Sequence, residues 1–222
     1  MSNRSSADGL LASLRRGVPL TGDVARDVPA FLIHHGFPHT AGHCEAVARE
    51  ARRLALVFGA DAAAAERAGW LHDVGVIFPN AERIGTARTL GVPVLPEEVA
   101  FPMIVPQNLS ALLARALFAE QDAAVLSAIG CHTTLKADAT AFDTVVFVAD
   151  KIAWDQPGVP PYLGDLLVAL THSLDAAALS YLRYLWEGRE TLGVIHPWFR
   201  NAYEQRAATG ATARYRPASP HD

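Results

Sequence analysis

The chain has 222 residues, of which 50% are hydrophobic and 8% aromatic, and its formal net charge is -4. This length favours one large domain with a buried core over two domains. The negative charge argues against a nucleic-acid-binding protein, whose Lys and Arg residues would gather on one face. A nucleotide remains possible as a small ligand.

Cysteine content and hydropathy indicate in which cellular compartment the protein is expected. The two cysteines, Cys44 and Cys131, are too few for a disulfide framework, and we interpret them as small buried residues. No apolar run has membrane-spanning length, and no signal-peptide pattern opens the chain, so no membrane partner is expected. We therefore expect a cytoplasmic protein.

The ends of the chain differ from its middle. Residues 1–22 are predicted to be a flexible lead, and residues 207–222 a disordered polar tail. Within residues 23–206, apolar residues recur at three- and four-residue spacing, and Gly or Pro interrupts the pattern every ten to twenty residues. This pattern predicts helices joined by loops, so the expected fold class is an all-α bundle with extra C-terminal helices.

The first two predicted helices of this domain carry polar residues near their ends. The stretch GHCEAVAREARRLALVFG has one apolar stripe and ends at Gly59, as a helix with a glycine C-cap would, and His43 lies near its start. Asp61 is expected to cap the next helix, AAAAERAGWLHDV. His72 and Asp73 then fall at the C-terminal end of that helix.

The middle of the chain is predicted to be a long loop followed by three helices. The loop, FPNAERIGTARTLGVPVLPEEVAFPMIVPQ, is expected to hold one short helix that begins at Pro96. The helices NLSALLARALF and DAAVLSAIGCHTT follow, and His132 lies near the end of the second. In TAFDTVVFVADKIAWD, the apolar run resembles a strand, but Thr140 and Asp143 resemble a capping box, which predicts a buried helix.

The last predicted helices lie in PYLGDLLVALTHSLDAAALSYLRYLWEG and HPWFRNAYEQ. Asp175 is a helix start signal, and Gly188 interrupts the pattern.

Five polar residues occupy inner positions of four predicted helices. They are His43, His72, Asp73, His132 and Asp150. Any one of these histidines by itself is more often a hydrogen-bonded core residue, but buried carboxylates are costly unless they are paired or bind a metal. Mixed His and Asp ligands suit iron, manganese, zinc or cobalt better than calcium or magnesium. We therefore predict a metal site.

These residues resemble the motifs of the HD-domain phosphohydrolases. HCEAVAREARRLA is similar to the first motif, with His43 rather than His39 as ligand, GWLHDVG to the His-Asp motif, and VADKIAWD to the last motif. Within that family, GCHTTLK and ADKI resemble the YqeK-like branch. That resemblance implies symmetrical hydrolysis of diadenosine tetraphosphate into two ADP at a two-iron site.

The resemblance also implies roles for the residues. His43, His72, Asp73 and Asp150 would bind a first metal, and catalytic Asp73 would bridge to a second that His132 binds. The cofactor would be one or two divalent transition metals, with iron favoured and manganese, cobalt or zinc as alternatives. Thr133, Thr134 and Lys151 would bind substrate phosphates, although Lys151 is equally compatible with a solvated helix end. A small-molecule nucleotide is the expected partner, and a homodimer is left open.

Several positions depart from the YqeK-like pattern. Pro106 stands where relatives carry a further metal-ligating His, Val76 where a Lys is common, and Leu135 where a Gly is common. Proline has no donor atom for a metal, so the second metal is in question. The alternatives are a nucleotidase or phosphodiesterase for another nucleotide, and a nucleotide-binding module with weakened catalysis.

Further residues have two readings each. Arg83 and Arg88, in the long loop, fit either phosphate binding or solvation. Stacking on adenine fits Trp154, Trp186 and Trp198, although aromatic packing is the commoner role.

Overall fold

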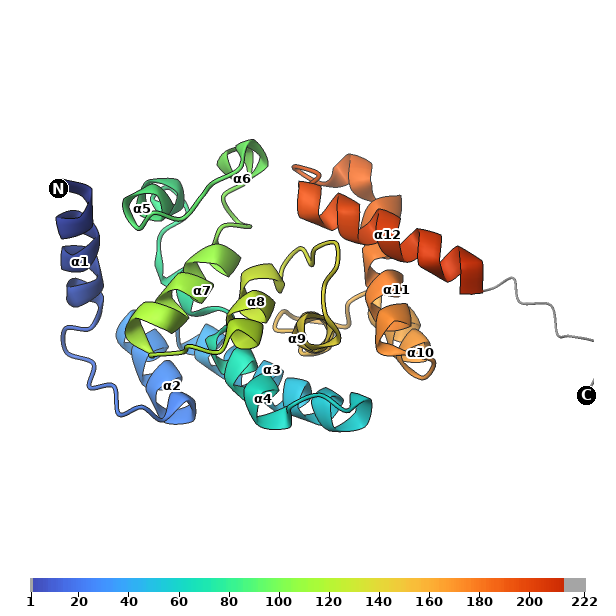
Figure 1. The fold of residues 1–222 in the computed structure, drawn as a ribbon, viewed down its shortest axis with the longest axis horizontal. Coiled ribbons are helices and arrows are strands. Elements are labelled where there is room, and N and C mark those ends of the chain that lie inside the picture. The colour runs from blue at the N-terminus through green and yellow to red at the C-terminus, as the bar shows by residue number, and fades with distance from the viewer. Residues whose placement is uncertain (1, 214–222) are drawn as a thin grey trace, which may run out of the picture.

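The computed structural model describes residues 2–213, and every regular element in that range is a helix (Figure 1). The predicted all-α fold class is therefore confirmed. The α-helices are α1 (Ser2–Leu14), α2 (Val24–His34), α3 (Pro38–Phe58), α4 (Ala62–Leu71), α5 (Arg83–Thr89), α6 (Pro96–Ala100), α7 (Pro106–Leu117), α8 (Ala123–Cys131), α9 (Ala141–Ile152), α10 (Leu163–Leu170), α11 (Leu174–Glu187) and α12 (Pro197–Ala213). Two 3₁₀ turns, η1 (Val74–Ile77) and η2 (Arg189–Thr191), complete the order. No helix in the described range is long and apolar enough to cross a membrane.

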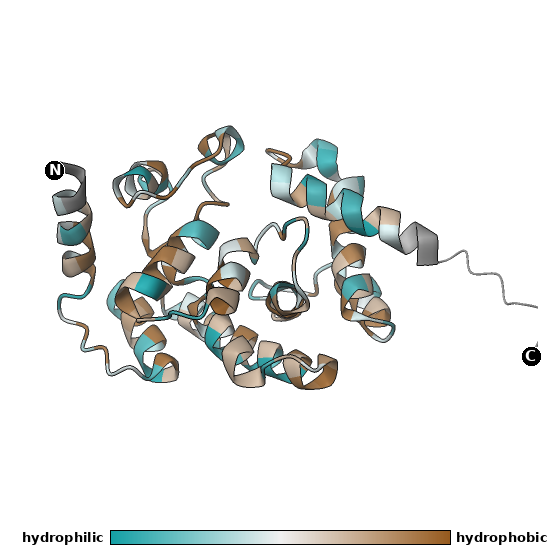
Figure 2. Cartoon of the chain, viewed as in Figure 1, coloured by the Kyte–Doolittle hydropathy of each residue, from teal (hydrophilic) through white to brown (hydrophobic). Residues whose placement is uncertain are grey.

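Helices α3 and α4 make the most extensive helix–helix contact, and α3 also packs against α9 and α2. Individual helices carry both apolar and polar residues, which Figure 2 shows as brown and teal on the same ribbon. Two apolar clusters result. The first contains residues of α1, α2, α3, α4, η1, α5, α7, α8 and α9, and the second contains residues of α3, α4, α8, α9, α10, α11 and α12.

Helix α9 contributes to both clusters, because Val146 packs in the first and Val145 and Phe147 pack in the second. Burial on all sides explains the continuous apolar run that resembled a strand in the sequence. The capping box is present: the Thr140 hydroxyl accepts from Asp143 N, and the Asp143 carboxylate accepts from Thr140 N. The prediction of a buried helix is thus confirmed.

Two glycines of GWLHDVG allow close backbone contacts. A Cβ atom on Gly69 would lie 2.5 Å from Ala48 Cα, so α4 packs directly on the backbone of α3. A Cβ atom on Gly75 would lie 2.7 Å from Pro106 O, and Gly75 N donates to Ser110 Oγ at 2.8 Å. The turn after α4 is therefore held against the start of α7.

Local end signals are mostly where the sequence places them. Gly59 ends α3 with φ 73°, and Asp61 caps α4 by accepting from Ala63 N and Ala64 N. Pro96 begins α6, and Gly188 ends α11. The N-cap of α11 is Ser173, two residues before the predicted start signal.

Three predictions about regular structure need correction. The predicted flexible lead contains α1, and Leu14 and Val18 are buried, because apolar residues recur at three- to four-residue spacing behind the polar first residues. The predicted long loop holds α5 as well as α6. In the predicted tail, α12 continues to Ala213, and residues 214–222 lie outside the described range.

Helix α6 is joined to the segment before α12 by a buried contact. Glu98 and His196 are 1% and 2% exposed, and His196 Nε2 lies 3.6 Å from Glu98 Oε1. Glu98 also accepts from Leu95 N and Asn108 Nδ2, while Trp198 N donates to His196 Nδ1. This contact connects α6 with the C-terminal helices.

Candidate metal centre

The five predicted metal ligands come together at the ends of four helices. His43 lies in the second turn of α3, His72 is the C-cap of α4, and Asp73 precedes η1. His132 is the C-cap of α8, and Asp150 lies in the last turn of α9. The side chains of His72 and Asp73, at 0% and 22% exposure, are the least and most exposed of the five.

Each of the three histidines uses one ring nitrogen to contact a backbone carbonyl. The Nδ1 atoms of His43, His72 and His132 lie 3.1 Å, 2.7 Å and 2.8 Å from the carbonyl oxygens of Ala153, Gly69 and Ile129. A carbonyl oxygen only accepts, so Nδ1 carries the proton in each ring. In the neutral rings, Nε2 therefore has a free lone pair, which is the usual arrangement of metal-ligating histidines.

These Nε2 atoms converge on one another and on the two carboxylates. His43 Nε2 lies 3.2 Å from His72 Nε2 and 3.1 Å from Asp150 Oδ1. His72 Nε2 lies 3.6 Å from Asp150 Oδ1 and 3.8 Å from Asp73 Oδ2. Ligands of one transition metal, each bonded at about 2.0–2.2 Å, lie about 3–3.5 Å apart. The lone pairs face one another without protons between them, so the residues fit a cation in their midst.

Asp73 faces two of the three histidines. Its Oδ2 faces His72, and its Oδ1 lies 3.6 Å from His132 Nε2. The sets that could hold an ion are His43, His72 and Asp73, and His72, His132 and Asp150. A bridging position for Asp73 is compatible with this geometry.

Both carboxylates have pKa values below the usual range. Burial raises the pKa of Asp73, but the interactions with His72 and His132 outweigh burial and lower it to about 2. Burial likewise raises the pKa of Asp150, but the Lys151 charge and the contact with His43 hold it well below its usual range. The carboxylates are therefore ionised at neutral pH, as metal ligation requires.

Lys151, predicted to bind substrate, is already paired. Its Nζ donates to Asp150 Oδ2 at 2.5 Å and lies 5.2 Å from the centre of the Phe147 ring. Burial lowers the pKa of Lys151, but the Asp150 carboxylate raises it above its ordinary value. Lys151 thus lines the site and orients Asp150, and it is not the solvated helix-end charge of the alternative reading.

The two predicted substrate-binding threonines have different surroundings. Thr133 lines the cavity, and its hydroxyl lies 3.1 Å from His132 Nε2. Thr134 is buried, and its hydroxyl contacts Gln107 Oε1 at 3.3 Å and donates to Leu135 O at 2.8 Å. Thr134 is absent from the cavity wall, so of the two threonines only Thr133 lines the cavity.

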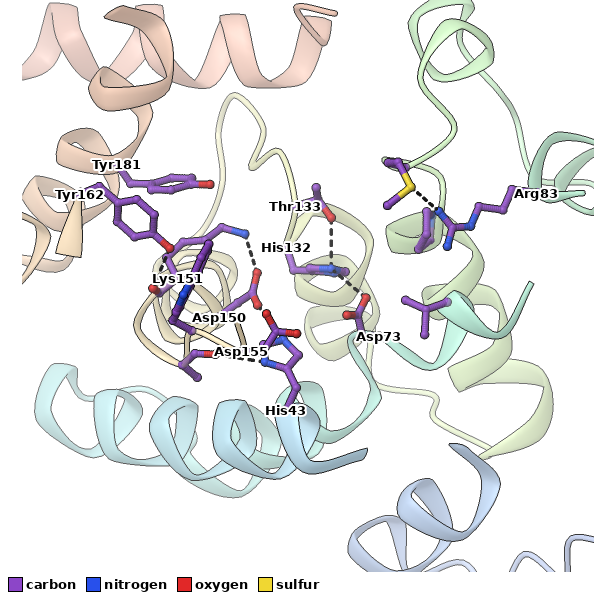
Figure 3. Close-up of a pocket in the computed structure, with 15 residues that line it drawn as sticks. His43, Asp73, Arg83, His132, Thr133, Asp150, Lys151, Asp155, Tyr162 and Tyr181 are labelled. Atoms are coloured by element: carbon purple, nitrogen blue, oxygen red, sulfur yellow. Dashed lines mark hydrogen bonds and ion pairs between the residues drawn. The ribbon is translucent and has the colours of Figure 1, made fainter. Parts of the chain in front are cut away.

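The cavity above the candidate ligands has a volume of about 260 Å³ (Figure 3). Arg83, the first residue of α5, and Met103, which lies between α6 and α7, line one side. The opposite side carries Lys151, Tyr162 and Tyr181. Trp154 and Asp155 also line the cavity, and Trp154 is 39% exposed.

Sequence reasoning missed four of these cavity residues: Met103, Asp155, Tyr162 and Tyr181. The signal that could have indicated Asp155 is its place at the end of the last motif, VADKIAWD.

The positions that depart from the YqeK-like pattern are also resolved. Pro106 and Val76 line the cavity, whereas Leu135 is fully buried. Gln107 does not line the cavity, and its Oε1 lies within hydrogen-bond distance of Thr133 N and Thr134 N. Neither Gln107 nor its neighbour on α7, Asn108, therefore lines the cavity in place of a histidine at position 106.

The two cysteines are buried, as predicted. Burial is the largest cause that raises the pKa of each thiol, to about 12 for Cys131.

Comparisons with known proteins agree with this architecture. An uncharacterized protein in the pepC 5′ region of Lactococcus lactis subsp. cremoris is 44% identical over 135 residues, which cover 61% of this chain and 68% of that protein. A crystal structure of a "predicted HD superfamily hydrolase involved in NAD metabolism" from Clostridium acetobutylicum has a TM-score of 0.73 at 20% identity, covering 82% of this chain and 96% of that one. The HD domain family model matches residues 40–155, a range that includes all five candidate ligands. The chain therefore belongs to the HD domain family.

Proposed function

We propose that this protein is a metal-dependent phosphohydrolase that cleaves dinucleoside polyphosphates, converting diadenosine tetraphosphate into two ADP. The observation that carries the proposal is the convergence of three Nε2 lone pairs and two ionised carboxylates at the floor of an accessible cavity. His43, His72, Asp73 and Asp150 would hold the first divalent cation. Asp73 would bridge to a second, which His132 would bind.

Hydrolysis of a phosphoanhydride needs a hydroxide and a way to neutralise developing negative charge. A bound divalent cation supplies both, because it lowers the pKa of water toward about 7 and polarises phosphoryl oxygens. Other groups of the chain orient the candidate metal ligands. The backbone carbonyls of Ala153, Gly69 and Ile129 fix the three imidazole rings, and Lys151 fixes Asp150. The Thr133 hydroxyl lies at the cavity wall, and it would be free to donate to a phosphate oxygen once His132 Nε2 binds a cation.

The nucleotide ends of the substrate would lie against the aromatic wall of the cavity. Trp154, Tyr162 and Tyr181 line that wall, and an aromatic ring provides a face on which a base stacks. Membership of the HD domain family supports a hydrolase activity in general terms. The resemblance of GCHTTLK and ADKI to the YqeK-like branch supports a dinucleoside polyphosphate as the substrate.

The products of a substrate panel test this proposal. The purified chain, reconstituted with iron or manganese, is incubated with diadenosine tetraphosphate, and the products are separated by chromatography. ADP alone is the expected result. ATP plus AMP would contradict symmetrical cleavage, and tight binding without turnover would favour the nucleotide-binding module instead.

A second candidate substrate is a dinucleotide with one pyrophosphate, because the Clostridium acetobutylicum protein is described as involved in NAD metabolism. The panel therefore includes NAD and a nucleoside monophosphate. Faster turnover of either compound than of diadenosine tetraphosphate would replace the proposed substrate.

Replacing a candidate ligand tests the site itself. We expect Asp73→Ala to lower phosphohydrolase activity at least about 100-fold, because losing even an outer partner of a metal ligand costs about 10- to 100-fold. Asp165→Ala, at an exposed position on α10, is the matched control and should keep full activity. Circular dichroism should show both variants helical. Near-normal turnover in Asp73→Ala would remove the basis for the site.

A further inference from the structure

Arg83 is a buried cation at the cavity wall. It is the first residue of α5, is 8% exposed and lines the cavity beside Met103. Among the residues that the structure describes, no carboxylate forms an ion pair with it. Burial lowers its pKa, and the charge of Asp73 acts in the opposite direction. A guanidinium stays protonated in such a setting, so a full positive charge lines this wall.

The hydrogen bonds of Arg83 leave one nitrogen unused. Nε donates to Phe78 O at 3.1 Å, and Nη1 contacts Asn80 Oδ1 at 3.4 Å and Met103 Sδ at 3.2 Å. A guanidinium has five N–H donors, two of them on Nη2. Nη2 has no acceptor within the described part of the chain. Two charge-assisted donors are thus available on a side chain whose position is fixed by its other nitrogens.

The other basic residue of the cavity differs in this respect. Lys151 is paired with Asp150 at 2.5 Å, so its charge is largely compensated. Arg88, on the same helix as Arg83, is exposed and does not line the cavity. Arg83 is therefore the cavity cation whose charge remains available to a ligand. A buried charge that the protein leaves unpaired is costly, and an anionic ligand would remove that cost.

We propose that Arg83 is a substrate-binding residue. Its Nη2 donates to non-bridging oxygens of a phosphate chain that lies in the cavity between Asp73 and Lys151. The two N–H groups of Nη2 suit phosphate oxygens because they are charge-assisted donors on a guanidinium that stays protonated. The inference rests on the proposed function in one respect, that the ligand carries phosphates. It does not depend on which phosphoanhydride is cleaved.

The direct test is the binding of inorganic tripolyphosphate to the metal-loaded protein, measured by calorimetry. We expect Arg83→Gln to weaken binding about 10- to 100-fold, the range for hydrogen bonds to a charged group. Arg83→Lys should recover part of the affinity, because it keeps the charge but not the two fixed N–H donors of Nη2. Arg88→Gln is the matched control and should bind as the unmodified chain does. Equal binding by the Arg83→Gln and unmodified proteins would overturn the inference.

Further measurements separate a role of Arg83 in binding from a role in the structure. Metal content and melting temperature are compared among the three variants, since Arg83 also holds Phe78 O. With diadenosine tetraphosphate, Arg83→Gln should raise KM more than it lowers kcat.

Added guanidinium ion should restore tripolyphosphate binding to an Arg83→Ala variant. Absence of that rescue in a folded, metal-loaded variant would count against the inference. Failure of the unmodified chain to cleave diadenosine tetraphosphate would refute the proposed substrate and leave the tripolyphosphate comparison intact.

Discussion

At the scale of single residues, the cavity histidines divide their two nitrogens between the backbone and the site. Nδ1 of His43, His72 and His132 contacts a carbonyl, and Nε2 faces the candidate ion position. The two carbonyls that contact His72 and His132 belong to residues three positions earlier in the chain. The helix ends thus fix both rings locally, whereas His43 depends on Ala153, which is 110 residues away.

Pro106 determines how many metal ions we expect. It lines the cavity at the first position of α7, where the missing N–H of proline has no helical partner to lose. Without a donor atom there, the second ion would have only Asp73 and His132, so we expect about one metal per chain by elemental analysis. Pro106→His should raise both metal content and phosphohydrolase rate.

The matched control for this experiment is Pro96→His. Pro96 also occupies the first position of a helix but does not line the cavity, so its replacement should leave the metal content unchanged. Two tightly bound ions in the unmodified chain, prepared without chelators, would show that this account of Pro106 is wrong.

Asp27 provides a residue-scale prediction about pH. Its carboxylate accepts from Thr21 N at 2.7 Å, Thr21 Oγ1 at 2.8 Å and Gly22 N at 2.8 Å. Burial raises the pKa of Asp27, but these hydrogen bonds outweigh burial and lower it from 3.8. Because the pKa is lower in the folded chain, the stabilisation is present above the unfolded value and is lost as the pH falls through the folded value.

We therefore expect Asp27→Asn to lower the free energy of unfolding at pH 7 by about 1–3 kcal/mol, measured with urea. The difference from the unmodified chain should shrink below pH 3.8. Asp8→Asn, at an exposed position of α1, is the control and should have little effect. A difference that stays constant down to pH 2 would contradict the role of the ionised carboxylate.

At the scale of elements, the position of the His-Asp pair depends on how closely α4 approaches α3. Gly69 has no Cβ, and an added one would lie 2.5 Å from Ala48 Cα and 2.7 Å from Ala48 N. These are backbone atoms, so relief requires the two helices to separate. Since His43 lies on α3 and His72 ends α4, separation also changes the distance between two candidate ligands.

We expect Gly69→Ala to destabilise the fold by about 1–3 kcal/mol or more, as overpacking does, and to lower metal affinity. Gly85→Ala is the matched control, because Gly85 lies within α5 with nothing within 4 Å of an added Cβ atom. That variant should gain up to about 1 kcal/mol from helix propensity. Urea unfolding and metal titration measure both effects, and equal stability of the two variants would contradict close packing at Gly69.

At the scale of the whole molecule, the candidate metal centre connects helices from both apolar clusters. Its residues come from α3, α4, α8 and α9, and an ion held among them would exist only in the folded chain. Binding to the folded state alone stabilises it by mass action. The metal is thus expected to contribute to stability as well as to chemistry.

Metal loading should therefore raise the melting temperature. With free metal at 100 times its Kd, the stabilisation is about 2.7 kcal/mol, which corresponds to a shift of about 5–10 °C for a chain of this size. Chelation should reverse the shift. His43→Ala should show little response to metal, and an equal response in that variant would place the stabilising ion elsewhere.

The sequence by itself determined the features that depend on neighbouring residues. Apolar spacing predicted the helices, Asp61 and the Thr140–Asp143 box predicted two helix starts, and Gly59 predicted a helix end. Such signals act over one or two turns, so a single sequence carries them in full. They were insufficient where apolar residues followed a polar beginning, as in α1, or where Pro and Gly surrounded a short helix, as in α5.

The motifs in the sequence also indicated the five candidate ligands, but only the tertiary structure decided which of their neighbours face the cavity. Thr133 lines it while Thr134 turns toward Gln107, and Arg83 lines it while Arg88 is exposed. Each choice depends on how segments distant in sequence pack, because a side chain's surroundings are set by the elements that cover it. Helix periodicity specifies which face of an element is apolar, but not which other element that face contacts.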